Sequence, residues 1–171
     1  MIRYSGVVCL SEDLRRVVLL HKLKPDWQKG KANFPGGKVE DCDYDPMNDG
    51  GDGGRLSMFL AQYRCAVREV REETSLGIGL PTLFCVIEKP EAECYFFYHV
   101  GDIAEAKTME AETVFADTVD NVLNGRTMRF CPDNGTLPTM PNLPWLLAMA
   151  LAHIKTGDLD GSSYLTIKTE D

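Results

Sequence analysis

The stretch REVREETS, residues 68–75, places three carboxylates and two arginines in six consecutive positions. On a helix, which turns about 100° per residue, Glu69 and Glu73 lie about 40° apart, and Glu72 lies about 60° to the other side of Glu69. The three carboxylates therefore share one helix face, where like charges repel one another. The pattern fits two interpretations, a solvated helix face or a site for a hard divalent cation.

The residues before this stretch predict the helix that carries it. Ser57 is a candidate N-cap, and the helix is expected to run to about Thr74. Four apolar residues recur at helical spacing and predict the face that packs on the core: Phe59, Tyr63, Ala66 and Val70.

The stretch FPGGKVE, residues 34–40, stands upstream, and its two glycines permit backbone geometry closed to other residues. Together, FPGGKVE and AVREVREETSLGI resemble the signature of the Nudix hydrolase family. That signature is a glycine, a later glutamate, and then Arg-Glu-aliphatic-any-Glu-Glu-any-Gly-aliphatic. The resemblance covers about residues 34–76. The matching residues are Gly37, Arg68, Glu69, Val70, Glu72 and Glu73.

The chain departs from the family pattern in three places. The spacing from Gly37 to Arg68 exceeds the family spacing by 17 residues, an acidic, glycine-rich insertion at about 41–55. Leu60 stands where the family has a glutamate, eight residues before the arginine, so this carboxylate is either missing or supplied by the insertion. Ser75 replaces the family glycine after the charged stretch.

The resemblance implies both a fold and a reaction. The fold is α+β, a Nudix-type α/β/α sandwich with a mixed β-sheet between helices, and residues 1–171 are expected to form one such domain. The reaction is metal-dependent hydrolysis of the diphosphate linkage in a nucleoside diphosphate derivative, with Mg²⁺ or Mn²⁺ as cofactor. A nucleoside triphosphate, giving nucleoside monophosphate and pyrophosphate, is the leading substrate class.

The resemblance also implies metal ligands. Glu69, Glu72 and Glu73 would hold Mg²⁺, and the carbonyl of Gly36 would add a neutral oxygen. Some family members use a further glutamate before a later strand. Glu112 is the first candidate here and Glu110 the second, with an ordinary surface acid as the equal alternative.

The same resemblance gives catalytic roles to three residues. Glu69 would position or deprotonate the attacking water, and Arg68 would orient Glu69 through a charge-assisted bond. Lys38 would meet a phosphate. It belongs to a lysine run that could draw a polyphosphate towards the site: Lys22, Lys24, Lys29, Lys31 and Lys38.

Base recognition is weakly encoded. Asn33 could hydrogen-bond a base edge, and Trp27 could stack on a purine, as could Phe34 and Trp145, although aromatic residues are more often part of the core. Within the insertion, DCDYDPMNDGG has the alternating acids of a calcium loop. Because Pro46 stands where such a loop requires glycine, we interpret the insertion as a flexible cover over the site.

Composition excludes some classes of partner. The formal charge of −8 argues against broad binding to nucleic acid or an anionic membrane, and no apolar run approaches the length of a membrane span. The six cysteines show no metal-ligand spacing, and no export signal is recognised, which predicts reduced thiols in the cytoplasm. The expected partner is a small nucleotide, and a homodimer stays open.

The remaining pattern predicts further strands and two more helices. Strands are expected at 2–10, 16–23, 80–88, 93–101, 112–117 and 163–168, and helices at 119–125 and 142–155. Two rival functions stay open. One is a catalytically weak Nudix-fold protein that binds nucleotide or regulates, which Leu60 and the insertion favour. The other is a calcium-responsive interaction domain that uses residues 41–52.

Overall fold

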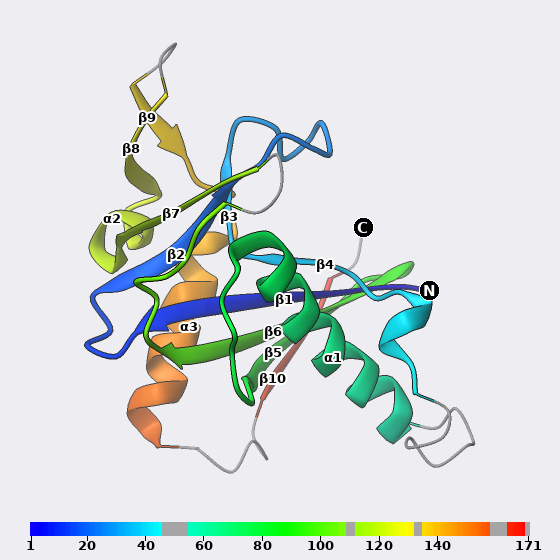
Figure 1. The fold of residues 1–171 in the computed structure, drawn as a ribbon. Coiled ribbons are helices and arrows are strands. Elements are labelled where there is room, and N and C mark those ends of the chain that lie inside the picture. Colours follow the sequence, from blue (N-terminus) through cyan, green and yellow to red (C-terminus); the bar gives the residue numbers. More distant parts are fainter. Residues whose placement is uncertain (46–54, 109–111, 132–134, 158–163, 170–171) are drawn as a thin grey trace.

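The computed structural model describes residues 1–45, 55–108, 112–131, 135–157 and 164–169, and it forms a mixed β-sheet between helices (Figure 1). The strands of the main sheet are β1 (Ile2–Ser11), β2 (Arg16–His21), β3 (Ala32–Asn33), β4 (Gly36–Lys38), β5 (Thr82–Glu88), β6 (Ala92–Gly101), β7 (Thr113–Thr118) and β10 (Leu165–Lys168). A separate hairpin is formed by β8 (Arg126–Cys131) and β9 (Gly135–Pro138). The helices are the short 3₁₀ helix η1 (Asp41–Asp43), α1 (Arg55–Thr74), α2 (Val119–Leu123) and α3 (Leu143–Thr156).

Strand β1 lies in the middle of the main sheet and is covered on both faces. Val8 and Leu10 belong to the buried cluster on the α3 side, whereas Val7 and Cys9 belong to the cluster on the α1 side. Successive side chains of a strand point to opposite faces, and all four of these are fully buried. The apolar run in the sequence is therefore the mark of a strand buried on two sides rather than one.

Helices α1 and α3 lie on opposite faces of the main sheet (Figure 1). Helix α1 begins at Arg55, so Ser57 lies inside the helix, and its prediction as the N-cap is wrong. Ala66 and Val70 pack on the sheet as predicted, whereas Phe59 is 38% exposed and belongs to no buried cluster. At this end of α1 the buried face consists instead of Ala61 and Cys65, which pack with Val39 and Tyr44.

The later strands largely follow the sequence prediction. Strands β5 and β6 pair as an antiparallel hairpin, and β10 pairs in parallel with β5. A β-bulge between Leu83 and Cys85 turns Phe84 and Cys85 towards the same cluster, which strict alternation would forbid. The hairpin of β8 and β9 was not predicted, because its polar, alternating strands carry only a weak apolar signal.

The divergence of β1 and β2 creates the position of the candidate site. These two strands pair only at Leu10 and Val17, next to the turn that joins them. Further along, β1 pairs with β4 and β2 pairs with β3, so the segment from β3 to β4 crosses between them. The N–H of Val7 donates to the carbonyl of Pro35 over 2.9 Å and fixes this crossing. Strand β4 is thereby held beneath α1.

No helix within the described ranges combines the length and the apolar character needed to cross a membrane.

The difference in burial between two leucines predicts a large difference in their contributions to stability. Leu146 on α3 is fully buried, whereas Leu80 is 86% exposed. We expect Leu146→Ala to lower the free energy of unfolding by about 2–5 kcal/mol, because it leaves a cavity as well as losing apolar burial. Leu80→Ala, the matched control, should change it by less than about 0.5 kcal/mol. Urea denaturation of both variants measures this, and equal losses would contradict the assigned packing of α3.

Candidate functional site

The two glycines of β4 form a close-packed floor beneath α1. Gly36 has φ of 151°, and a Cβ there would lie 2.3 Å from the carbonyl oxygen of Ser5 and 2.7 Å from Cα of Gly6. A Cβ on Gly37 would lie 2.3 Å from Cδ and Oε1 of Glu69. The first glycine therefore lets β4 approach the backbone of β1, and the second lets a carboxylate rest directly on β4.

Glu73, one turn after Glu69, is buried and also reaches β4. Its Oε2 accepts a hydrogen bond from the N–H of Gly36 over 2.8 Å, and its Oε1 accepts one from Nζ of Lys22 over 3.0 Å. Burial raises the pKa of Glu73 to about 7, although Lys22 opposes this shift. The pKa of Glu69 is also raised, chiefly by burial, and Arg68 opposes the shift.

Glu112, the candidate glutamate before β7, joins the same place. It forms an ion pair with Lys22, and its Oε1 accepts a hydrogen bond from the N–H of Leu23 over 3.1 Å. Strand register explains why Lys22 and Glu112 meet. The last pair of the antiparallel ladder between β2 and β7 is His21 with Thr113, and Lys22 and Glu112 are the next residues beyond that pair. Sequence analysis named Glu112 as a candidate site residue but did not predict that Lys22 would pair with it. Glu110 lies outside the described residues.

Arg68 connects two carboxylates of the charged stretch, Glu69 and Glu72, to Asp43 of η1. Its Nε and Nη2 donate to Oδ1 and Oδ2 of Asp43, each over 2.9 Å, which makes the pair bidentate. Its Nη1 donates to Oε1 of Glu69 over 2.8 Å and to Oε2 of Glu72 over 2.9 Å. Nη2 also donates to the carbonyl of Lys38 over 3.2 Å. The bidentate pair orients the guanidinium plane, and the structure contains the contact from Arg68 to Glu69 through which Arg68 would orient that carboxylate.

Asp43 is the site residue that sequence analysis missed. Counting back from Arg68 led to Leu60, but counting six residues forward from Gly37 leads to Asp43, which supplies the carboxylate that Leu60 lacks. Asp43 is 2% exposed, and its Oδ2 also accepts a hydrogen bond from the N–H of Glu40 over 2.9 Å. The signal was available in the spacing from Gly37, which places the 17 additional residues between Asp43 and Arg68, so the insertion begins after residue 43 and not at about residue 41 as predicted.

The segment at about 41–55, predicted to be a flexible cover, differs from that prediction in the part that the structure describes. Residues 41–43 form η1, whose capping box joins Glu40 and Asp43, and Asp43 is tied to α1. The carboxylate of Asp43 is therefore engaged by a guanidinium and does not serve a calcium loop. Residues 46–54 lie outside the described part of the chain, so the rest of that interpretation stays a prediction.

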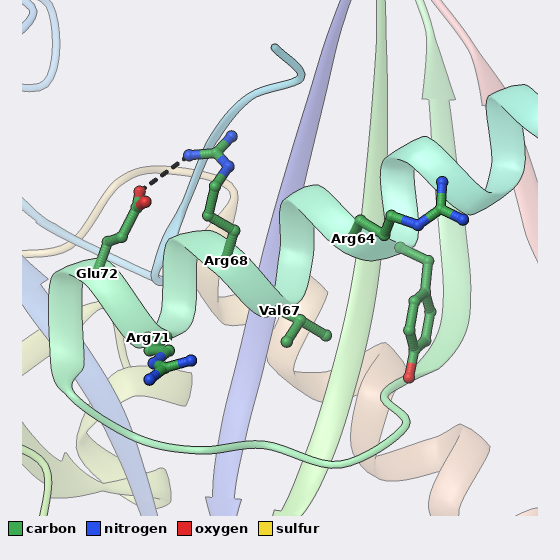
Figure 2. A pocket seen from close by; sticks show the side chains of 6 residues that line it. Arg64, Val67, Arg68, Arg71 and Glu72 are labelled. Carbon is green, nitrogen blue, oxygen red and sulfur yellow. Dashed lines mark hydrogen bonds and ion pairs between the residues drawn. The ribbon is translucent and has the colours of Figure 1, made fainter. Parts of the chain in front are cut away.

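Glu72 is the most exposed of the three carboxylates of the charged stretch. Its side chain is 49% exposed, against 14% for Glu69 and 9% for Glu73. Figure 2 shows its ion pair with Arg68 on one side of the α1 axis and Arg71 on the other. The outer face of α1 is hollowed by an open cavity of about 600 Å³. The residues that line it are Tyr63, Arg64, Val67, Arg68, Arg71 and Glu72.

The predicted substrate-binding residues are less well assembled. Lys38 is exposed beside Gly37, where a phosphate could meet it. The amide of Asn33 donates to Oε1 of Gln28 over 2.9 Å, and its Oδ1 accepts from the N–H of Phe34, so both ends already have partners. Trp27 is 62% exposed, and its carbonyl accepts a hydrogen bond from Nζ of Lys31 over 2.9 Å. Phe34, 4% exposed, belongs to the core.

The carboxylates and their cations form two ion-paired groups, one around Lys22 and one around Arg68, which together we call the site network. Its members are Lys22, Asp43, Arg68, Glu69, Glu72, Glu73 and Glu112. Carboxylate oxygens are the donors that Mg²⁺ prefers, and the glycine floor lets two of them meet at β4, so the donor set fits a hard cation. Among the described residues, no three acidic, histidine or cysteine side chains stand together as a ready-made metal cluster. Lys22 and Arg68 lie between them.

Comparison with known proteins identifies the fold. No family model matches the sequence, and no curated protein sequence does. A NUDIX hydrolase from Alicyclobacillus acidocaldarius matches the structure with a TM-score of 0.66 at 14% identity, covering 96% of each chain. The mutator MutT protein from Bacillus halodurans matches with a TM-score of 0.56 at 20% identity, covering 88% of this chain and 82% of its own.

A third match is the NUDIX domain of Shewanella oneidensis NrtR, solved with ADP ribose. It matches with a TM-score of 0.64 at 12% identity, covering 90% of this chain and 88% of that domain. NrtR has also been solved with a 27mer DNA, and there this chain covers 62% of the matched protein. The chain therefore has the Nudix fold, and the predicted α+β sandwich with a mixed sheet is confirmed.

The contact between Asp43 and Arg68 predicts an acid-dependent contribution to stability. Burial alone would raise the pKa of Asp43, but the hydrogen bonds from Arg68 and Glu40 outweigh it and lower the pKa. A lowered pKa adds stability above the unfolded value, about 3.9, and this stability is lost as the pH falls through the folded value. We expect Asp43→Asn to lose about 1–3 kcal/mol at neutral pH.

Urea denaturation of wild type and variant from pH 7 down to pH 3 measures this difference. The gap between them should narrow below about pH 4 as the aspartate is protonated. Asp41→Asn, on an exposed neighbour in the same 3₁₀ helix, is the matched control. A gap for Asp43→Asn that stays constant with pH would contradict the ionised pair.

Proposed function

We propose that this chain is a metal-dependent hydrolase that cleaves the diphosphate linkage of a nucleoside diphosphate derivative. One observation carries the proposal: α1 brings the carboxylates of Glu69 and Glu73 onto the paired glycines of β4. Converging oxygens of this kind suit Mg²⁺ or Mn²⁺, and a diphosphate needs its negative charge neutralised before water can attack phosphorus. The Nudix fold supports the same reaction.

Each residue of the site has a role in the proposed reaction. When bound, the metal would polarise the phosphate and activate the attacking water. Glu69, oriented by Arg68 through Oε1, would hold the water in line and accept its proton. Glu73, and Glu72 through its exposed carboxylate, would hold the cation together with the carbonyl of Gly36. Glu112 would add a further carboxylate from the edge of β7.

In the proposed hydrolysis, the oxygen of water forms a bond to phosphorus and the bridging P–O bond breaks. The leaving phosphate takes the electron pair, and the proton of water passes to Glu69. For a nucleoside triphosphate, the products are a nucleoside monophosphate and pyrophosphate. Lys38, exposed beside Gly37, would pair with a phosphate oxygen of the substrate.

We further propose that the whole chain acts as one domain on a small nucleotide, in a reducing compartment such as the cytoplasm. Five cysteines are free, which supports reducing conditions: Cys9, Cys42, Cys65, Cys85 and Cys94. The rival proposal is a Nudix-fold protein that binds nucleotide without turnover. The absence of a carboxylate at Leu60 was an argument for it, and Asp43 weakens that argument by supplying one.

Product analysis distinguishes these two proposals. The panel holds standard and oxidised nucleoside triphosphates, ADP-ribose, a nucleotide sugar and a dinucleoside polyphosphate, each with Mg²⁺ and Mn²⁺. We expect turnover of one class, reduced at least about a hundredfold by Glu73→Gln and Glu69→Gln, because each removes a charge that orients the reaction. Glu105→Gln, on an exposed residue, is the control. Tight binding of a nucleotide with no cleavage would favour the rival proposal.

The glycine floor predicts a second loss of activity. Gly37→Ala would place its Cβ 2.3 Å from the Glu69 carboxylate, so the carboxylate must move. We expect turnover to fall by about a hundredfold or more, since displacements of about 1 Å have effects of this size. Gly77→Ala, whose Cβ would meet nothing within 4 Å, should retain activity. Equal turnover in Gly37→Ala and wild type would rule out this position of Glu69.

A further inference from the structure

Lys22 is the buried cation at the centre of three structural elements. It follows β2, and its residue is 8% exposed. Its ammonium contacts Glu73 on α1 and Glu112 before β7, and the side chains of these glutamates are 9% and 6% exposed. The backbone of Lys22 is fixed as well, because its N–H donates to Lys31 and its carbonyl accepts from Gly30, each over 2.9 Å.

Both oxygens of each glutamate have a partner, and one of the two partners is Lys22. In Glu73, Oε1 is bound to Lys22 and Oε2 to the N–H of Gly36. In Glu112, Oε2 is bound to Lys22 and Oε1 to the N–H of Leu23. The two N–H groups are part of the backbone and are held in place, whereas the lysine ammonium is at the end of a flexible four-carbon side chain. The ammonium is therefore the partner that a cation would have to displace.

The charge of the site network gives the displacement its direction. Five carboxylates face two cationic side chains, Lys22 and Arg68. Arg68 is bound by three carboxylates, including a bidentate pair with Asp43, and this anchors it. Lys22 has a single flexible ammonium within a site that keeps an excess of negative charge. An ammonium and a divalent cation at the same two carboxylates would repel each other.

We infer that Lys22 is a resident counter-cation of the metal site, which holds Glu73 and Glu112 in place and competes with a divalent cation for them. This inference rests on the proposed function, because it takes these glutamates as metal ligands. It assigns Lys22 a positioning role, distinct from the exposed lysines of the same run. The affinity of the site for metal is then limited by the cost of separating Lys22 from its partners.

The test is the binding of Mn²⁺ alone, measured by titration calorimetry and by the loss of the free Mn²⁺ signal in electron paramagnetic resonance. Lys22→Gln removes the charge but keeps hydrogen-bond donors for the two glutamates, and Lys22→Met removes both. We expect each to bind Mn²⁺ about tenfold more tightly than wild type, since a nearby positive charge is lost. Lys22→Arg, which keeps the charge, should stay within about threefold of wild type.

A second measurement is the melting temperature with and without Mn²⁺. Without metal, Lys22→Gln should melt below wild type, because two buried carboxylates lose their counter-ion, and added Mn²⁺ should raise its melting temperature by more than it raises that of wild type. Lys155→Met, on an exposed lysine of α3, is the matched control and should behave as wild type in both measurements. A purely structural role for Lys22 would lower stability without tightening Mn²⁺ binding.

The outcomes separate this inference from the proposed function. If wild type binds Mn²⁺, Glu73→Gln abolishes binding and Lys22→Gln leaves the affinity unchanged or weaker, the metal site stands and the inference is wrong. If neither wild type nor Lys22→Gln binds Mn²⁺, both are overturned. Binding by Lys22→Gln alone would support the inference in its strongest form, with Lys22 blocking the site.

Discussion

The structure depends on the close approach of two backbones, β1 and β4, and one carboxylate at Gly36 and Gly37. Any side chain on Gly36 would collide with the backbone of β1, and any side chain on Gly37 would collide with Glu69. The divergence of β1 and β2 opens the space that β4 occupies. Helix α1 packs on the face of the sheet that carries Val7 and Cys9, and its charged last turns contact the two glycines. The site is therefore a consequence of how the sheet splits.

Charge balance is the second organising constraint. Carboxylates that converge in a partly buried place need counter-ions, and the chain provides two of different character. Arg68 is held by a bidentate pair and orients its neighbours, whereas Lys22 is a flexible ammonium between two buried glutamates. In the proposed hydrolase, Arg68 would stay in place, and Lys22 would give way to the metal.

The insertion changes how the signature of the family is read. It lies between Asp43 and Arg68, so the short half of the signature, from Gly37 to Asp43, stays intact, and the helical half begins afresh at α1. The 3₁₀ helix η1 turns Asp43 back towards α1, where it binds Arg68 across 25 positions of sequence. A long insertion is tolerated there because the entropic cost of closing a loop increases only slowly with its length.

By itself, the sequence determined the Nudix fold, the helix that carries Glu69, Glu72 and Glu73, and the two glycines beneath it. The helix is encoded in local periodicity, and the glycines mark positions where the backbone geometry or a close approach requires glycine. Only the tertiary structure decided which distant residues complete the site. Lys22 and Asp43 stand far from the helix in sequence and carry no periodic signal, and they meet it through strand register and the turn of η1. The exposure of Glu72, beside the largely buried Glu69 and Glu73, was likewise decided by tertiary packing, which one-dimensional spacing does not contain.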